Sequence, residues 1–270
     1  VEDTLAVYTR KIAKALDAVG LMNIQYVYDG KTIYVIEVNP RASRTVPILS
    51  KVTGVPMVKL AVAAMLGHKL KESAYGTGLY SKREKYSVKV PVFSSAKLTD
   101  MDIALGPEMK STGEVLGIDE NVDRALYKGF LAAGTDIPVS GNLFAAIRQA
   151  ELTPYTAEIL KDYAEAGFTI YVSPDDLDFV REYAVEAKAM TYDTAIGWIG
   201  SRDGNSKKKI DLVVNVPEMA NNKENDSFPV RRKAVERGIP TMTCMDTAKA
   251  FLKAIRLKQD GVKLEYAKLY

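Results

Sequence analysis

The stretch that decides the first part of the fold is residues 21–41, which read Leu-Met-Asn-Ile-Gln-Tyr-Val-Tyr-Asp-Gly-Lys-Thr-Ile-Tyr-Val-Ile-Glu-Val-Asn-Pro-Arg. Two runs rich in β-branched and aromatic residues flank Asp29-Gly30, a dipeptide typical of hairpin turns. The pattern predicts an antiparallel hairpin over residues 21–38. Before it, residues 4–19 have the apolar spacing of an amphipathic helix that stops at Gly20.

Polar side chains gather where the second predicted strand ends. Glu37 and Asn39 are two residues apart, so on a strand both side chains point to the same face, and Gln25 lies on the partner strand. Arg41 and Arg44 follow at once. Mg²⁺ prefers oxygen ligands and combines a few protein oxygens with phosphate oxygens, and the planar fork of arginine suits phosphate. The set indicates a metal–nucleotide phosphate site, although the spacing alone also fits a strand end with a surface ion pair.

The middle of the chain is more interrupted. We expect a helix over residues 56–66, a strand over 86–93 and a helix over 121–133 with Asn121 as its cap. Residues 104–117 are rich in glycine and are not expected to form one regular element.

From about residue 138 onward, predicted strands and helices alternate. Strands are expected over residues 143–147, 168–172, 212–216 and 240–244, and helices over residues 154–166, 174–187, 231–237 and 246–257. This βαβ series implies a parallel sheet covered on both faces. The expected fold class is therefore α/β, with an antiparallel first domain over residues 1–137 and a doubly wound second domain over residues 138–270.

Several motifs resemble those of a known enzyme family. Gln25 together with residues 37–45 (Glu-Val-Asn-Pro-Arg-Ala-Ser-Arg-Thr) resembles the metal- and phosphate-binding end of the ATP-grasp fold. Residues 20–25, residues 47–56 (Pro-Ile-Leu-Ser-Lys-Val-Thr-Gly-Val-Pro) and residues 106–117 (Gly-Pro-Glu-Met-Lys-Ser-Thr-Gly-Glu-Val-Leu-Gly) look specifically like carbamoyl phosphate synthetases. The resemblance covers nearly the whole chain.

The resemblance implies roles for the polar cluster. Gln25, Glu37 and Asn39 match the positions that hold divalent cations, Mg²⁺ or Mn²⁺, with Glu37 bridging the metals and, with Gln25, helping to bind the nucleotide. Arg41 and Arg44 match catalytic basic positions beside the phosphates of ATP. The reaction implied is the ATP-dependent phosphorylation of carbamate to carbamoyl phosphate, which feeds arginine or pyrimidine synthesis.

The resemblance also implies what surrounds the chain. It matches the end of the second ATP-grasp half of the large subunit, so the nucleotide-clamping lobe is expected before Val1 and the chain alone is expected to be inactive. The implied partners are the rest of the large subunit and a glutaminase small subunit. Residues 111–114 are either a turn that joins the two domains or a contact that relays regulation.

The C-terminal domain resembles the methylglyoxal-synthase-like regulatory domain of this family, on residues 213–217, 230–234 and 238–240. Asn215, at the carboxyl end of a predicted strand, is either a loop-capping amide or an effector ligand. Trp198 and Asn222 are further candidates for an effector pocket, although Trp198 also suits a core or lid position. Residues 173–176 (Ser-Pro-Asp-Asp) replace the usual phosphate-binding turn, so we expect a different small-molecule effector, or none.

Composition excludes other classes. The net charge is +3, from 37 basic and 34 acidic residues, which is too balanced to indicate a nucleic-acid partner. No apolar run reaches the ~18 residues of a membrane span. The single cysteine, Cys244, fits a reducing cytosol, and the one histidine, His68, lies outside the C-terminal domain and suits a helix-end surface position. The alternatives are another ATP-grasp ligase and a regulatory module with a vestigial ATP lobe.

Overall fold

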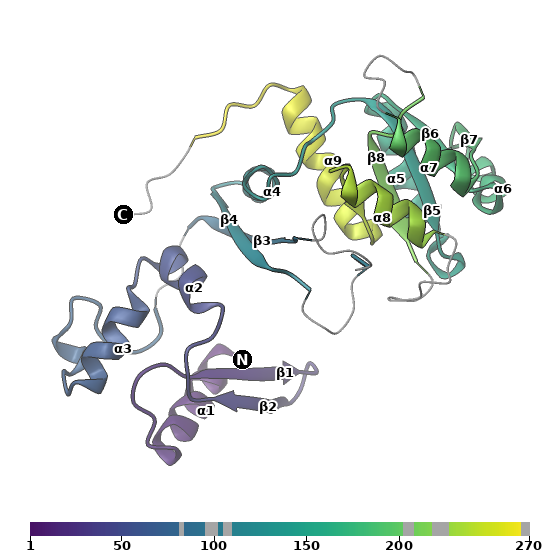
Figure 1. Ribbon diagram of the computed structural model, residues 1–270. Helices are drawn as coiled ribbons and strands as arrows, with labels where there is room; N and C mark the ends of the chain where they lie inside the picture. The colour runs from purple at the N-terminus through teal and green to yellow at the C-terminus, as the bar shows by residue number, and fades with distance from the viewer. Residues whose placement is uncertain (81–83, 95–101, 105–109, 202–207, 218–226, 266–270) are drawn as a thin grey trace. The chain divides into compact units, whose positions relative to one another are not determined.

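The structure is a computed structural model of the 270-residue chain, and it describes residues 1–80, 84–94, 102–104, 110–201, 208–217 and 227–265. The chain forms two compact units, one within Val1–Glu84 and one within Lys85–Glu265 (Figure 1).

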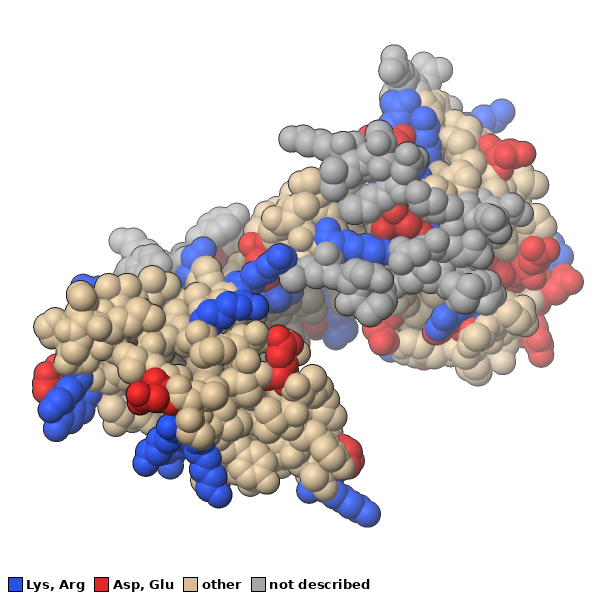
Figure 2. All heavy atoms as spheres, turned by 60° about the horizontal axis from the view of Figure 1, so that its bottom comes forward, with Lys and Arg blue, Asp and Glu red and all other residues tan. Residues whose placement is uncertain are grey.

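The N-terminal unit is built from three α-helices, one hairpin and a short 3₁₀ turn among its described residues. Its elements are α1 (Glu2–Ala15), β1 (Asn23–Tyr28), β2 (Ile33–Asn39), α2 (Val46–Thr53), α3 (Met57–Met65) and η1 (Leu70–Glu72). Val46 and Ala61 are the only buried apolar side chains among the described residues of this unit, whereas Ile36 and Leu66 are 62% and 74% exposed. Figure 2 accordingly shows wide uncharged areas on this unit, between scattered basic and acidic side chains.

The hairpin contains a β-bulge. Near the turn, Tyr26 is opposite Val35, but beyond it Gln25 is opposite Glu37, so Ile36 is an extra residue in β2. In a regular pairing of the same residues, without the bulge, Gln25 would be opposite Ile36 and Glu37 would be opposite Ile24. Glu37 would then point to the other face from Gln25, because a slip of one residue exchanges the two faces of a strand.

The C-terminal unit begins with an antiparallel ribbon and a helix. Strands β3 (Tyr86–Val92) and β4 (Gly113–Asp119) pair, and α4 (Val122–Ala132) packs on both of them. Asn121 caps α4, since its side-chain oxygen accepts hydrogen bonds from the backbone nitrogens of Asp123 at 2.9 Å and Arg124 at 3.1 Å.

A five-stranded parallel sheet, in the order β7-β6-β5-β8-β9, makes up the rest of this unit. Its strands are β5 (Gly141–Ile147), β6 (Phe168–Val172), β7 (Ala187–Ala189), β8 (Leu212–Val216) and β9 (Thr241–Met242). The α-helices that follow α4 are α5 (Pro154–Glu165), α6 (Leu177–Glu182), α7 (Tyr192–Gly200), α8 (Phe228–Glu236) and α9 (Met245–Gln259), and short 3₁₀ turns η2 (Gln149–Glu151) and η3 (Pro174–Asp176) follow β5 and β6.

Apolar side chains cover both faces of the sheet. Leu143 and Ile147 of β5 join a cluster with Phe251 of α9, while Phe144 of β5 joins a second cluster with Val230 of α8. Alternate residues of one strand thus enter different cores, which is the arrangement expected of a parallel sheet covered on both faces.

The expected α/β class, the hairpin and the parallel sheet are confirmed, with some differences in detail. The helix expected over residues 174–187 was wrong in its extent, because α6 ends at Glu182, Ala184 adopts a left-handed φ of 56°, and β7 follows. Helices α2 and α7 were not predicted. The packing places β3, β4 and α4 with the parallel sheet, in the unit within Lys85–Glu265; the domain boundary near residue 138 stays a prediction.

Within the described ranges, no single helix has both the length and the apolar composition to cross a membrane. The pair α2 and α3 passes such a test only when the two are joined, and they are bent by 109°.

Candidate functional site

The register of the hairpin brings Gln25, Glu37 and Asn39 together. Gln25 and Glu37 are directly opposite each other, and such cross-strand pairs point to the same face. Glu37 and Asn39 share that face, and the Asn39 amide donates a hydrogen bond from Nδ2 to Oε1 of Glu37 at 2.6 Å. Gln25 and Glu37 are exposed and Asn39 is half-buried. The three predicted metal ligands therefore form one cluster at the open end of the hairpin.

The two predicted phosphate-binding arginines follow the strand in a tight turn. The backbone nitrogen of Arg41 donates to the carbonyl of Asn39 at 2.8 Å, and its Nη1 donates to the carbonyl of Ala42 at 3.0 Å. Arg44 lies two residues before α2 begins. Both arginines are exposed, so their guanidinium groups are accessible to a ligand.

The donor set fits a cation only in part. Among the residues that the structure describes, no three His, Cys, Asp or Glu side chains form a metal-binding group. One carboxylate (Glu37) and two amides (Gln25, Asn39) supply oxygen ligands that Mg²⁺ accepts, but they carry one negative charge. The remaining charge must come from the ligand, as it does when Mg²⁺ is bound together with nucleotide phosphates.

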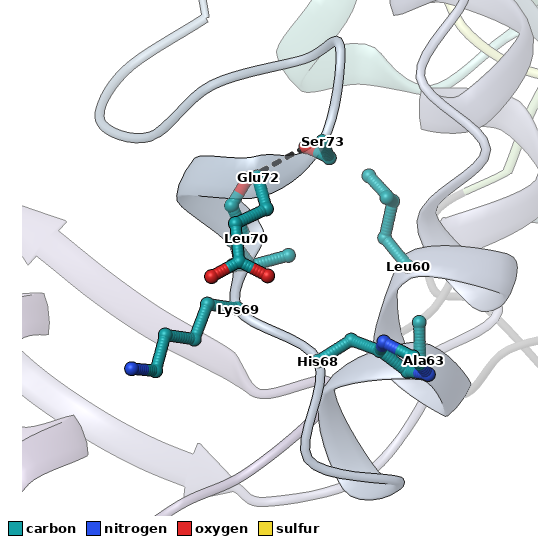
Figure 3. Close-up of a pocket in the computed structure, with 7 residues that line it drawn as sticks. All are labelled: Leu60, Ala63, His68, Lys69, Leu70, Glu72 and Ser73. Carbon is teal, nitrogen blue, oxygen red and sulfur yellow. Dashed lines mark hydrogen bonds between the residues drawn. The ribbon is translucent and has the colours of Figure 1, made fainter.

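A separate hollow of about 150 Å³ lies between α3 and η1, lined by Leu60, Ala63, His68, Lys69, Leu70, Glu72 and Ser73. Figure 3 shows the imidazole of His68 beside Ala63, apart from the carboxylate of Glu72, while Ser73 donates its hydroxyl to the carbonyl of Leu70 at 2.7 Å. His68 is exposed, as predicted. His68 and Glu72 do not form an acid–base pair here.

In the C-terminal unit, a hollow of about 200 Å³ opens at the carboxyl ends of the central strands, where ligands bind in open α/β sheets. Its polar lining includes Arg148, Ser173, Asp175, Asp176 and Ser227. Burial raises the pKa of Asp176, and this effect exceeds the opposing hydrogen bonds from the Ile147 backbone and the Ser173 hydroxyl. The acids expected at this edge from the sequence do line the hollow.

The predicted effector residues lie elsewhere or outside the described structure. Asn215 is fully buried, and its amide oxygen accepts a hydrogen bond from Arg231 at 2.6 Å. Trp198 packs edge-on against Tyr171, with ring centroids 5.3 Å apart. Neither lines the hollow, and Asn222 falls outside the described residues. Their roles in effector binding stay predictions.

Sequence reasoning singled out Asn215 but did not predict that it forms a buried group with Arg231, Asp102 and Ser227. Arg231 and Asn215 have no exposed surface, and Asp102 and Ser227 are 5% and 4% exposed. Helical spacing was one signal that Arg231 points inward, because it lies next to Val230, three residues before Ala234 and four after Ser227. All four residues are buried in the structure.

Comparison with known proteins shows what the segment around this site is similar to. Residues 2–73, which contain the whole Gln25–Arg44 cluster, match the family model described as carbamoyl-phosphate synthase L chain, ATP binding domain. The polar cluster thus lies in a segment that is similar to the ATP-binding domain of this family.

Two curated relatives are similar to nearly the whole chain. The chain is 51% identical over 267 residues to the carbamoyl phosphate synthase large chain of Clostridium acetobutylicum, covering 98% of this chain and 24% of the relative. It is 44% identical to the protein of the same name from Clostridium perfringens (strain SM101), covering 96% of this chain and 24% of the relative. The chain is therefore related to the carbamoyl phosphate synthase large chain, as its motifs predicted, and it spans about a quarter of the length of these relatives.

Proposed function

We propose that this chain is the C-terminal portion of a carbamoyl phosphate synthase large chain, and that its hairpin forms one wall of an ATP-grasp site that phosphorylates carbamate. In that reaction a carbamate oxygen attacks the γ-phosphorus of ATP, the bond from that phosphorus to the bridging oxygen of ADP breaks, and carbamoyl phosphate forms. The observation that carries the proposal is the cluster of Gln25, Glu37 and Asn39 within the segment that matches an ATP-binding domain.

Each polar group has a task in this proposal. Glu37, Gln25 and Asn39 would hold Mg²⁺ or Mn²⁺, and the ion would supply neutralisation of charge on the phosphoryl group. Arg41 and Arg44 contact phosphate oxygens in the same exposed region. The large exposed apolar side chains of the N-terminal unit, such as Ile36 and Leu66, support a further lobe packing against this unit.

The partners follow from the same proposal. The remainder of the large chain supplies the nucleotide-clamping lobe, and a glutaminase small subunit supplies ammonia. The chain by itself is expected to have no carbamoyl phosphate synthase activity, because it spans only about a quarter of the length of its relatives.

The test is Glu37→Gln in the chain joined to the rest of its large subunit. The substitution keeps the shape of the side chain but removes the only carboxylate of the cluster, so we expect carbamoyl phosphate formation to fall by 10³-fold or more, as an order of magnitude for lost metal-assisted charge stabilisation. Glu72→Gln is the matched control, since Glu72 is an exposed glutamate of the same unit outside the cluster. Turnover of the Glu37 variant close to that of the control would refute the metal role.

A second function, effector binding by the C-terminal unit, is favoured by the hollow at the sheet edge. We propose that residues 138–270 form a methylglyoxal-synthase-like regulatory domain. Asp175 and Asp176 in the hollow disfavour a phosphate dianion in the position usual for this class of domain. Calorimetric titration with nucleotides and with amino acids distinguishes the outcomes: saturable binding to this unit supports regulation, and silence towards all of them contradicts it.

A further inference from the structure

Among the described residues, the largest fully buried side chain is that of Arg231. Its Nη1 donates to Oδ1 of Asn215 at 2.6 Å and to Oγ of Ser227 at 2.9 Å. Its Nε and Nη2 donate to the two carboxylate oxygens of Asp102, at 3.1 and 2.7 Å. Arginine thus binds this carboxylate with both arms of its fork, the geometry that makes such pairs strong and specific.

The members of this group come from two parts of the chain. Asn215 lies on β8, and Ser227 and Arg231 lie at the start of α8, whereas Asp102 lies 129 positions before Arg231, between β3 and β4. Ala104 follows Asp102 and is also buried, and its backbone nitrogen donates to Oδ1 of Asp102 at 2.9 Å. A short stretch of backbone is therefore docked on the parallel-sheet part through one carboxylate.

Asn215, Ser227 and Arg231, the members from the parallel-sheet part, have more hydrogen-bond donors than acceptors. The Nδ2 of Asn215 is buried and has no hydrogen-bond partner among the described residues. An arginine and an unpartnered amide N–H group together favour an anion at this position. A buried guanidinium left without an anion is strongly destabilising, so this group needs a carboxylate or a similar anion whenever the unit is folded.

We propose that Arg231, Asn215 and Ser227 form an anion cradle, that the chain fills it with its own Asp102 carboxylate, and that small carboxylates or phosphate compete for the same place. The internal anion holds residues 102–104 against β8 and α8. The cradle adjoins the hollow at the sheet edge, because Ser227 lines that hollow and also accepts a hydrogen bond from Arg231. This proposal does not depend on the reaction assigned to the hairpin.

The charge state of Asp102 agrees with this role. Burial alone would raise its pKa, but the hydrogen bonds from Arg231 and from the Ala104 backbone outweigh burial, and the net effect lowers the pKa. Asp102 is therefore ionised near neutral pH and occupies the cradle as a carboxylate.

Competition of this kind has a reciprocal consequence. If the Asp102 carboxylate and an external anion exclude each other, removing one must strengthen binding of the other, by linkage. The wild-type chain should bind formate or inorganic phosphate weakly at this place, and a chain without the Asp102 carboxylate should bind them measurably.

The experiment uses the 270-residue chain with Asp102→Ala. Loss of one partner of a buried pair should lower the midpoint of thermal unfolding by on the order of 10 °C. Sodium formate, which replaces the lost carboxylate, should restore about 3–6 °C at ten times its dissociation constant, in a saturable manner. Sodium chloride at the same ionic strength should restore much less.

Asp162→Ala is the matched control, because Asp162 pairs with Arg256 at 3.1 Å on the surface of the same unit. It should change the midpoint little and show no specific response to formate. The double variant Asp102→Ala/Arg231→Met removes the stranded charge, so it should recover part of the lost midpoint and lose the formate response.

Two further readouts complete the test. If Asp102→Ala does not fold in chloride, its refolding yield in formate should exceed its yield in chloride. Hydrogen exchange at Ala104 and along β4 should be faster in the variant and slow down again in formate. Equal effects of formate and chloride on stability or yield would overturn the cradle, and unchanged exchange in a folded variant would overturn the tie to residues 102–104.

Discussion

Replacing Gly117 by alanine tests how α4 is held on the β3–β4 ribbon. A Cβ added at Gly117 would lie 1.9 Å from the carbonyl oxygen of Ala125 and 2.7 Å from the backbone nitrogen of Gly129. Both atoms belong to the backbone of α4, so no side-chain rotation can relieve the overlap. Gly129 makes the reciprocal approach, because a Cβ there would lie 2.5 Å from Cγ2 of Val90 on β3. The helix and ribbon thus touch through two glycines.

The cost follows from how little α4 can move. To bring the new carbon to an ordinary contact distance, the helix must retreat by more than ~1 Å. Its opposite side packs on α9, where Phe130 meets Phe251 edge-on at a centroid distance of 5.2 Å. We expect the free energy of unfolding to fall by about 3 kcal/mol, the upper end of the usual range for overpacking. For a unit of this size that lowers the unfolding midpoint by roughly 6–12 °C.

Gly113→Ala is the matched control on the same strand. A Cβ at Gly113 would meet only Cβ of Val92, at an ordinary 3.7 Å. Its effect should stay within about 1 kcal/mol, and part of it should be stabilising because alanine restricts the unfolded chain. Chemical and thermal unfolding of both variants, followed by circular dichroism, measures the difference. Equal losses in the two variants, or a loss below about 0.5 kcal/mol for Gly117→Ala, would refute the close-approach argument.

Three further changes test the core and its buried charges. Tyr163→Phe removes a fully buried hydroxyl that donates to the carbonyl of Ala248 at 2.7 Å, and should cost about 1–2 kcal/mol in a urea titration; no change would contradict that bond. Burial raises the pKa of Asp176 above its ordinary 3.8, so ionisation of this carboxyl destabilises the wild type as pH rises from there. Asp176→Asn should therefore be more stable than the wild type towards neutral pH and should lose that advantage below pH 3.8. Parallel pH profiles of stability for the two proteins would argue against this effect. Burial would raise the pKa of Asp119, but the ammonium of Lys128, 2.8 Å away, contributes to a net lowering of that pKa. The wild type should therefore lose stability as pH falls below 3.8. Lys128→Met should be less stable by about 2–3 kcal/mol at neutral pH, and its stability should fall less steeply with acidification.

Elements with a strong apolar signal could be predicted from the sequence. The strands over residues 143–147, 168–172 and 212–216 lie within or match β5, β6 and β8, because buried parallel strands are continuous apolar runs. Helix α7 was not predicted from the sequence, because its first turn is polar and glycines interrupt its apolar spacing. Its one local signal was Thr191, whose hydroxyl oxygen accepts from the backbone nitrogen of Thr194 at 3.3 Å as an N-cap.

The hairpin shows a finer limit of sequence reasoning. Alternation and the Asp29-Gly30 turn predicted two antiparallel strands, and the structure has them. Gln25 and Glu37 come together only because β2 has a bulge at Ile36. No local sequence pattern predicts this bulge, because an extra β-branched residue is indistinguishable from an ordinary strand residue. The three side chains lie together as expected, but the reason lies in the register, and their role as metal ligands stays a prediction.

The buried Arg231 shows what helical spacing alone can predict about a side chain. Its inward position follows from the buried residues around it in α8, whereas Arg232 pairs with the more exposed Glu236, with 3.0 Å between Nε and Oε1. An arginine on the inner face of a helix must find an acceptor elsewhere in the fold, since burying its charge alone is prohibitive. The sequence can state that requirement, but only tertiary structure identifies Asp102, because a partner 129 positions away leaves no periodic trace. Contacts of this kind bind residues 102–104 to the C-terminal sheet, and sequence periodicity cannot predict them because they depend on tertiary packing.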